Sequence, residues 1–198
     1  MNIPPVTWGL LVANLLAYFL QQLAPGLFIP LFALWPLGND AGPSFLPWQI
    51  FTYGFLHGNM LHLIFNMFGL YMFGREVELL LGTKRYLIYY LTCVASGGAM
   101  QLLIMGQMAD ASATLGASAG VLGVLFAFGM AYPRRIILLI FPPIPMPAWV
   151  FVTLFILLDL YLGLTGSRSG VAHFAHLGGM LGGYLLLRHW RSNRPRRR

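Results

Sequence analysis

Six long apolar stretches constrain the fold of this chain more than any other feature of its sequence. A helix needs about 20 mostly apolar residues to cross the hydrocarbon core of a bilayer. The candidate spans run over residues 7–24, 58–80, 84–106, 117–133, 147–165 and 171–188. Only 9% of the residues are charged, whereas soluble domains carry about a quarter. The sequence therefore predicts an all-α membrane protein, a bundle of six transmembrane helices, and argues against a soluble or disordered chain.

The positive charges predict how these helices are oriented. If the chain crosses six times, all but one of the 12 Lys and Arg residues fall on one side, and only Arg168 falls on the other, with Asp40 and Asp110. Because basic residues favour the cytoplasmic side, we expect both termini to be cytoplasmic. Residues 1–190 would then form the membrane domain and residues 191–198 a basic cytoplasmic tail.

The net charge of +7 does not indicate a nucleic-acid-binding protein. Half of the basic residues lie between Arg188 and Arg198, directly after the last apolar segment, and there is no basic face with interleaved aromatic residues. Such a tail fixes topology or contacts anionic lipid headgroups. The single cysteine, Cys93, excludes an internal disulfide, and we expect it to be a core residue.

The stretch from about residue 25 to residue 57 is apolar but does not have the form of a further span. After Pro25 it is interrupted by four further prolines, and it contains two tryptophans; these residues are Pro30, Pro36, Pro43, Pro47, Trp35 and Trp48. Prolines interrupt a helix, and tryptophans favour the interface between lipid and water. We therefore expect a first loop that is embedded in the membrane without crossing it.

The first polar cluster is the segment Gly116-Ala117-Ser118-Ala119-Gly120 at the start of the fourth span. A serine in a membrane helix usually bonds a backbone carbonyl or a neighbouring helix. This span is short, however, so its first residues could lie below the membrane surface. At a helix N-terminus, the Ser118 hydroxyl would stand beside free N–H groups that can hold an oxyanion.

The second cluster lies in the sixth span, where His176, Gly179 and Gly183 share one helical face. Glycines four residues apart allow close approach to another helix, and the fourth span offers small residues such as Gly120 and Gly123. Such packing would bring His176 to Ser118 as a base beside a nucleophile. The alternative is a histidine that only bonds across helices.

The third cluster places His62 and Asn66 on one face of the second span, four residues apart. Structurally, Asn66 could connect two helices by a hydrogen bond. Functionally, a side-chain amide is a good oxyanion donor. This cluster alone does not decide between the two interpretations.

A metal site is the main chemical competitor, since His57, His62, His173 and His176 fall near one side of the membrane. No Asp or Glu lies within ten residues of any of them, and no His-Glu-x-x-His motif is present. We therefore expect no metal and no cofactor. Asp159 is either a third catalytic member or a carboxylate solvated near the outer end of its helix, and we favour the solvated interpretation.

Taken together and in this order, the three clusters resemble the rhomboid family of intramembrane serine proteases. The matching pieces are His62-x-x-x-Asn66, Gly116-x-Ser118, and Ala-His176 followed by Gly179 and Gly183. The segment Val77-Glu78 with Gly82 is also similar to the family. The resemblance covers almost the whole chain, from the first loop to the end of the sixth span.

The resemblance implies a Ser-His dyad that hydrolyses peptide bonds in or near transmembrane helices of membrane-protein substrates. Ser118 would be the nucleophile and His176 the general base. Asn66, His62 and the backbone around Gly116 and Ser118 would stabilise the oxyanion or bind substrate. The expected partners are transmembrane proteins and the lipid bilayer. The short loops favour a bacterial inner membrane as the location, with the membrane of an organelle as the alternative. The sequence indicates neither the substrate nor the oligomeric state.

Two positions depart from the family pattern. The first loop has Trp48-Gln49 where members often have Trp-Arg, which raises the question of how the loop is anchored. Leu122 stands where many members have an aromatic residue that packs against the histidine, so His176 would be held less rigidly.

Two alternative functions follow from the same sequence. A catalytically silent rhomboid-like protein would bind client transmembrane helices, although silent relatives usually lose the serine or the histidine and this chain keeps both. A polar-solute channel would need a polar path through the whole membrane, whereas the polar residues here cluster near one side.

Overall fold

The computed structural model describes residues 3–38, 42–108, 112–138, 143–165 and 172–193. The elements are α1 (Pro5–Leu23), α2 (Pro25–Phe32), α3 (Gln49–Thr52), the 3-10 turn η1 (Tyr53–Phe55), α4 (Met60–Gly69), the π-helical segment η2 (Leu70–Gly74), α5 (Arg75–Leu81), α6 (Thr83–Met108), α7 (Ser118–Ala131), β1 (Ile136–Leu138), β2 (Pro145–Pro147), α8 (Ala148–Leu164) and α9 (His173–Ser192). All six predicted spans are helical, with α4, η2 and α5 forming one continuous segment. Arg168, Asp40, Asp110 and residues 194–198 lie outside the described residues.

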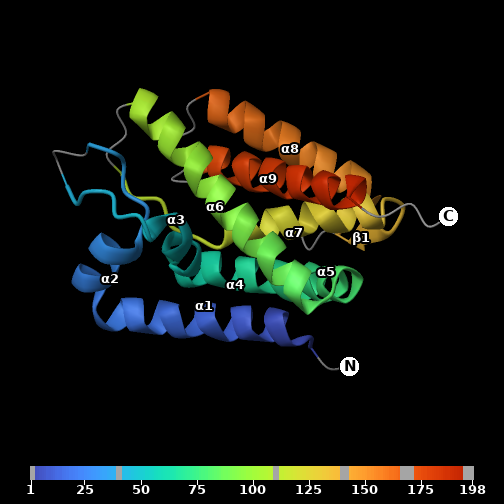
Figure 1. Cartoon of the computed structure of the whole chain (residues 1–198), viewed down its shortest axis with the longest axis horizontal. Helices are drawn as coiled ribbons and strands as arrows, with labels where there is room; N and C mark the ends of the chain where they lie inside the picture. Colours follow the sequence, from blue (N-terminus) through green and yellow to red (C-terminus); the bar gives the residue numbers. More distant parts are fainter. Residues whose placement is uncertain (1–2, 39–41, 109–111, 139–142, 166–171, 194–198) are drawn as a thin grey trace.

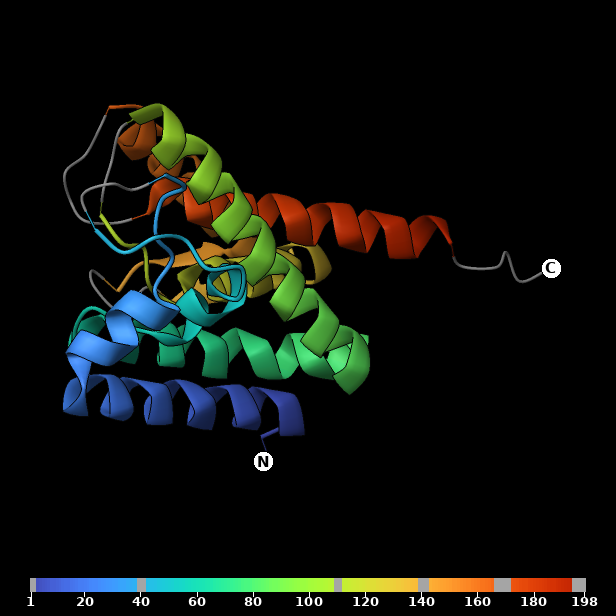
Figure 2. The same cartoon turned by 60° about the vertical axis from the view of Figure 1, so that its left-hand side comes forward.

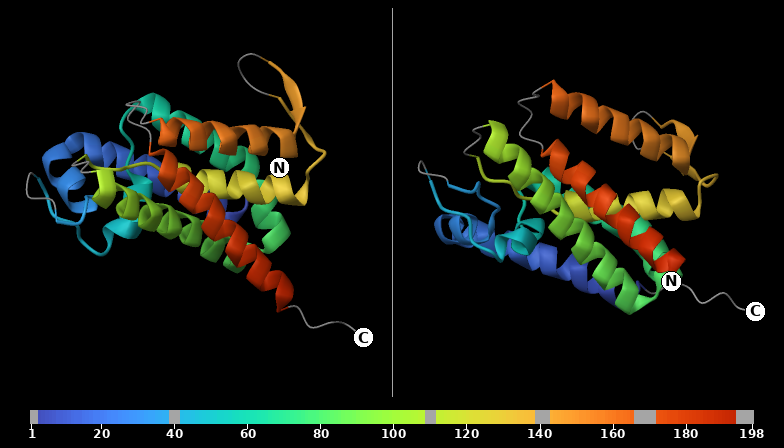
Figure 3. Two further views of the ribbon diagram at one scale, coloured as in Figure 1. Left: turned by 90° about the horizontal axis from the view of Figure 1, so that it is seen from above. Right: turned by 45° about the horizontal axis from the view of Figure 1, so that its top comes forward.

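The helices form one bundle in which α6 crosses between α1 on one side and α9 on the other (Figures 1 and 2). The first residue of α1 and the last residue of α9 lie at the same end, which the β1–β2 hairpin also occupies (Figures 1 and 3). The expected position of both termini on one side is consistent with this arrangement. Their cytoplasmic location stays a prediction.

Close packing of α7 against α9 depends on small residues, as the sequence indicated. A Cβ atom added at Gly179 would overlap the backbone of Ala119 on α7, and one added at Gly123 of α7 would lie 3.4 Å from the Gly179 carbonyl oxygen. Gly183 faces α6 instead, where a Cβ would overlap the side chains of Tyr89 and Cys93. The backbones of α7 and α9 therefore approach closely enough to bring short side chains together. Cys93 is fully buried in this core, as expected.

Gln49 anchors the first loop from a fully buried position. Its Nε2 donates to the carbonyl oxygens of Pro30 at 3.1 Å and Leu31 at 3.4 Å. Its Oε1 accepts from the backbone N–H groups of Trp35 at 3.3 Å and Leu46 at 3.2 Å. One neutral amide thus satisfies four backbone groups, which shows how the loop is held without the arginine that is common in the family.

The opposite end of the bundle has its own polar anchor. Glu78 of α5 is buried and accepts hydrogen bonds from the backbone N–H groups of Val6 at 3.0 Å and Thr7 at 2.7 Å. It also accepts from the Thr7 hydroxyl at 2.8 Å. A carboxylate at the first turn of α1 satisfies N–H groups that have no partner within the helix.

Among the described residues, two helices are both long and apolar enough to cross a membrane. They are Pro5–Leu23 with mean hydropathy 1.3 and Thr83–Gly106 with mean hydropathy 1.6, while α7 and α8 are apolar but shorter. Large apolar side chains also face outward, for example Leu16, Leu61 and Leu157, which suits a lipid-facing surface. The count of six crossings and the membrane-embedded first loop stay predictions.

Candidate active site

The structure contains a cavity of about 1270 Å³. It is lined by residues of η1, α4, η2, α6, α7, α8 and α9 and by the segment 112–116 that precedes α7. The first residues of α4, α7 and α9 lie at the end of the bundle opposite the chain termini (Figure 1). Ser118, His176, His62, Asn66 and Gly116 all face the cavity. The structure thus brings together every residue that the sequence nominated for the site.

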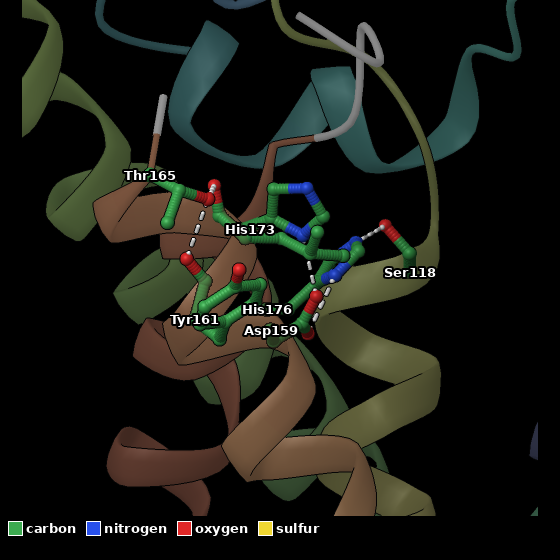
Figure 4. Close-up of polar contacts among 7 residues, drawn as sticks. Ser118, Asp159, Tyr161, Thr165, His173 and His176 are labelled. Atoms are coloured by element: carbon green, nitrogen blue, oxygen red, sulfur yellow. Dashed lines mark hydrogen bonds and ion pairs between the residues drawn. The ribbon is translucent and has the colours of Figure 1, made fainter. Parts of the chain in front are cut away.

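Ser118 and His176 lie at hydrogen-bonding distance from each other, which is the arrangement expected of a nucleophile and its base. Ser118 is the first residue of α7, so α7 begins where the sequence predicted. Its Oγ lies 2.8 Å from Nε2 of His176 on α9 (Figure 4). The pair is partly buried and opens into the cavity, where an imidazole can accept the hydroxyl proton as a substrate arrives.

Asp159 is not solvated, and the favoured interpretation of this residue was wrong. The side chain is buried and points from α8 towards α9 (Figure 4). Its Oδ2 lies 3.0 Å from Nδ1 of His176, and its Oδ1 lies 2.6 Å from Nδ1 of His173. The predicted span 147–165 has almost the same extent as α8, so the difference lies in how the helix is rotated: α8 turns this carboxylate towards α9 and away from solvent.

Both the backbone conformation and the surroundings of Gly116 disfavour any residue other than glycine. Its φ of +136° lies in a region that other residues rarely adopt. A Cβ there would also come within 2.7 Å of Cε1 of His62 and within 3.6 Å of Oγ of Ser118. Gly116 therefore lets the His62 ring lie directly beside the backbone that leads into the nucleophile.

His62 and Asn66 stand across the cavity from α9 on the first turns of α4. Nδ2 of Asn66 donates to the His62 carbonyl at 2.9 Å, which leaves its second N–H group for another acceptor. The His62 ring packs edge-on against the buried His57 ring, with centroids 5.1 Å apart. Asn59 caps α4 by accepting from the His62 N–H at 2.8 Å, so both side chains are held by local structure.

An aromatic ring does lie beside His176, although it comes from a different helix than the family pattern suggests. Leu122 is buried in a cluster with Phe155 of α8. The Phe155 ring centroid lies 6.5 Å from that of His176, tilted by 49°. Sequence reasoning missed Phe155 because it is one of many apolar residues on α8, and its orientation was not evident.

Asp159, His173 and His176 are the only described group of three His, Cys, Asp or Glu side chains with the spacing of a metal site. Their potential ligand atoms lie within 4.8 Å of one another. Both carboxylate oxygens are, however, at hydrogen-bonding distance from an imidazole nitrogen. Hydrogen bonds therefore account for the cluster with no further ligand.

Comparison with known proteins identifies a family. A model described as "Rhomboid domain" matches residues 45–191. The chain is 29% identical over 183 residues to "Rhomboid protease GlpG" of Photorhabdus laumondii, covering 92% of this chain and 60% of the relative. It is 30% identical over 133 residues to "Rhomboid protein 1, mitochondrial" of Saccharomyces cerevisiae, covering 66% of this chain and 38% of the relative.

A plant protein, "RHOMBOID-like protein 4" of Arabidopsis thaliana, is 28% identical over 142 residues, which is 70% of this chain and 33% of the relative. The chain thus spans between about a third and three fifths of the length of these relatives. The family match includes α4 to α9 almost entirely, and with them every residue of the candidate site.

Proposed function

The chain belongs to the rhomboid family, and we propose that it is an intramembrane serine endopeptidase that uses Ser118 and His176. The observation that carries this proposal is the 2.8 Å contact between Ser118 Oγ and His176 Nε2 at the wall of an open cavity. The relatives named as rhomboid proteases support the same reaction class at the level of the family.

The reaction begins with attack of Ser118 Oγ on the carbonyl carbon of the scissile peptide bond. His176 Nε2 accepts the hydroxyl proton as the tetrahedral intermediate forms, and then gives it to the leaving amine. The C–N bond breaks, and an acyl group remains on Ser118. A water molecule, deprotonated by the same nitrogen, then hydrolyses this ester and restores the serine.

Developing negative charge on the carbonyl oxygen needs hydrogen-bond donors that are fixed before the reaction. The backbone N–H of Ser118 at the N-terminus of α7, the second amide N–H of Asn66 and the His62 ring all border the cavity. We assign them to the oxyanion or substrate site, with Gly116 as the residue that allows their close approach.

The substrates in this proposal are membrane proteins with a transmembrane helix, and the location is a bacterial inner membrane. The outward-facing apolar side chains of the helices are consistent with a bilayer around the bundle. A helical peptide bond is protected by its own hydrogen bonds, so a substrate helix must unwind locally before it reaches Ser118. We expect no metal or other cofactor.

A serine-reactive fluorophosphonate tests the proposal without a known substrate. Attack of Ser118 on phosphorus displaces fluoride, and His176 takes the proton. We expect a single adduct on Ser118, located by mass spectrometry of the purified protein in mild detergent. The adduct disappears in Ser118→Ala and is strongly reduced in His176→Ala.

The same experiment distinguishes the protease from the second candidate, a catalytically silent protein that binds client helices. Absence of an adduct on protein that remains folded would contradict the protease proposal and favour helix binding. Liposome permeability that is unaffected by Ser118→Ala would instead favour a channel.

A further inference from the structure

The two oxygens of Asp159 each face a different imidazole, and this arrangement has a chemical consequence. Oδ2 is 3.0 Å from Nδ1 of His176, and Oδ1 is 2.6 Å from Nδ1 of His173. The three side chains are 5%, 9% and 7% exposed for Asp159, His176 and His173. A carboxylate that is withdrawn from water to this degree needs hydrogen-bond donors in place of the lost water, and the two Nδ1 atoms stand where such donors are required.

With the carboxylate ionised and both imidazoles neutral, one placement of protons satisfies all the contacts. A carboxylate can only accept, so both Nδ1 atoms must carry hydrogen. A neutral imidazole has a single N–H, so Nε2 of His176 must carry a lone pair. That nitrogen faces Ser118 Oγ at 2.8 Å, and the hydroxyl is then the donor. This is the form of His176 that can act as a base.

Asp159 is also the only described negative charge at this end of the bundle. The other described acidic residues, Glu76 and Glu78, lie on α5, where Glu76 pairs with Arg135 and Glu78 holds the start of α1. The titratable groups around His176 are Asp159 from α8, His173 on its own helix, and His62 across the cavity on α4. A carboxylate can accept from two Nδ1–H groups at once, one on each oxygen, whereas a neutral imidazole offers a single acceptor nitrogen.

We propose that Asp159 is a positioning residue that holds His176 in the Nδ1–H tautomer, and that His173 fixes Asp159 through its second oxygen. The proposal rests on the proposed function, because it concerns how the base of that reaction is prepared. It extends the Ser-His pair to a chain of four side chains: Ser118, His176, Asp159 and His173. The same carboxylate would stabilise the imidazolium that forms when Ser118 gives up its proton.

The direct test is the tautomer itself, which does not depend on activity. In protein labelled with ¹⁵N-histidine, the two neutral tautomers of an imidazole have distinct ¹⁵N chemical shifts. We expect His173 and His176 to be protonated at Nδ1 near neutral pH, with signals assigned through single histidine variants. An Nε2–H tautomer at His176 would overturn the proposal, even if Ser118 were found to be reactive.

The second test is the rate of fluorophosphonate labelling in Asp159→Asn. The amide keeps the shape of the carboxylate but has one acceptor oxygen, so it cannot accept from both imidazoles. We expect the labelling rate at Ser118 to fall roughly 10²- to 10⁴-fold. Glu76→Gln is the matched control, since it removes a carboxylate at the other end of the bundle. The labelling rate at Ser118 in this variant should equal that of the native protein.

His173→Phe separates the two parts of the proposal. The ring is retained, but the donor to Oδ1 of Asp159 is lost, and we expect a labelling rate about tenfold lower.

Native-like labelling by folded Asp159→Asn would contradict the role of Asp159, and native-like labelling by folded His173→Phe would contradict that of His173. If a variant fails to fold, the tautomer measurement on the native protein still decides. A native protein that shows the expected tautomers but no adduct would refute the proposed function while leaving the hydrogen-bond chain intact.

Discussion

The bundle holds two buried carboxylates at opposite ends, Glu78 and Asp159, and they are satisfied in different ways. Glu78 accepts from two backbone N–H groups and the Thr7 hydroxyl. None of these donors changes its protonation state near neutral pH. Asp159 accepts from two imidazoles, and one of them also contacts the Ser118 hydroxyl. We infer that Glu78 fixes the fold, whereas Asp159 serves the chemistry.

The largest expected effect is the loss of activity in His176→Ala. Removing the base of a serine protease costs about 10⁴-fold or more in rate. His176 is buried and donates to Asp159, so the variant should also lose about 1–3 kcal/mol of stability, and the labelling rate is compared for molecules that remain folded. Labelling kinetics and a thermal unfolding curve on the same sample measure both effects. Labelling of His176→Ala at the native rate would contradict the inference that the Asp159 end of the bundle serves the chemistry.

The opposite result is expected for Glu78→Gln. The amide cannot accept from all three donors of α1, so an N–H or hydroxyl group is left without a partner, which costs about 1–3 kcal/mol. We expect a lower unfolding temperature, but an unchanged labelling rate for each molecule that remains folded. Reduced labelling of fully folded protein would show that the two ends of the bundle are coupled. It would contradict the inference that Glu78 serves only the fold.

Acidic pH should affect the site more than the anchor. An imidazolium cannot accept the Ser118 proton, so the labelling rate should fall as pH is lowered from about 8 to about 5, by up to tenfold per unit on the acid limb. The direction follows from the need for a neutral base. A flat profile over this range, with the protein folded throughout, would exclude His176 as the base.

A smaller effect is expected for Phe155→Leu. Leucine preserves the apolar contact with Leu122 but removes the ring that lies 6.5 Å from the His176 ring. Aromatic contacts of this kind contribute about 0.5–1.5 kcal/mol, so we expect the labelling rate to fall by roughly two- to tenfold. Phe151→Leu, one turn earlier on the same helix, is the matched control. Equal losses in both variants would indicate a general packing effect.

The smallest expected effect is that of a chelator. The proposed nucleophile and base are both side chains, so incubation with EDTA should leave the labelling rate unchanged. Loss of labelling that added Zn²⁺ restores would contradict this expectation. The group Asp159, His173 and His176 would then have to be considered a metal site.

The structure supports the sequence analysis best where the sequence carried local signals. The six helical segments follow from continuous apolar runs, and α7 begins at Ser118 as its glycine-rich start indicated. The approach of Ser118 to His176 was foreseen from the small residues that α7 and α9 present to each other. Gln49 was identified as a departure, but the four hydrogen bonds that make it an adequate anchor could not be read from its neighbours in sequence.

The orientation of α8 was beyond the reach of the sequence. This helix is apolar almost all round, so no periodic pattern indicates which face turns inward. The sequence therefore favours a solvated Asp159 and does not indicate Phe155 as a neighbour of His176. Both differences concern α8, and both depend on how this helix is rotated about its own axis.

The sequence by itself determined which segments are helical and supplied a nucleophile and a base with small residues around them. These features depend on side-chain chemistry and on spacing along a single helix. Tertiary structure alone decided which carboxylate and which ring support His176. The reason is that contacts between helices depend on how each helix is rotated and packed, which an evenly apolar surface does not encode.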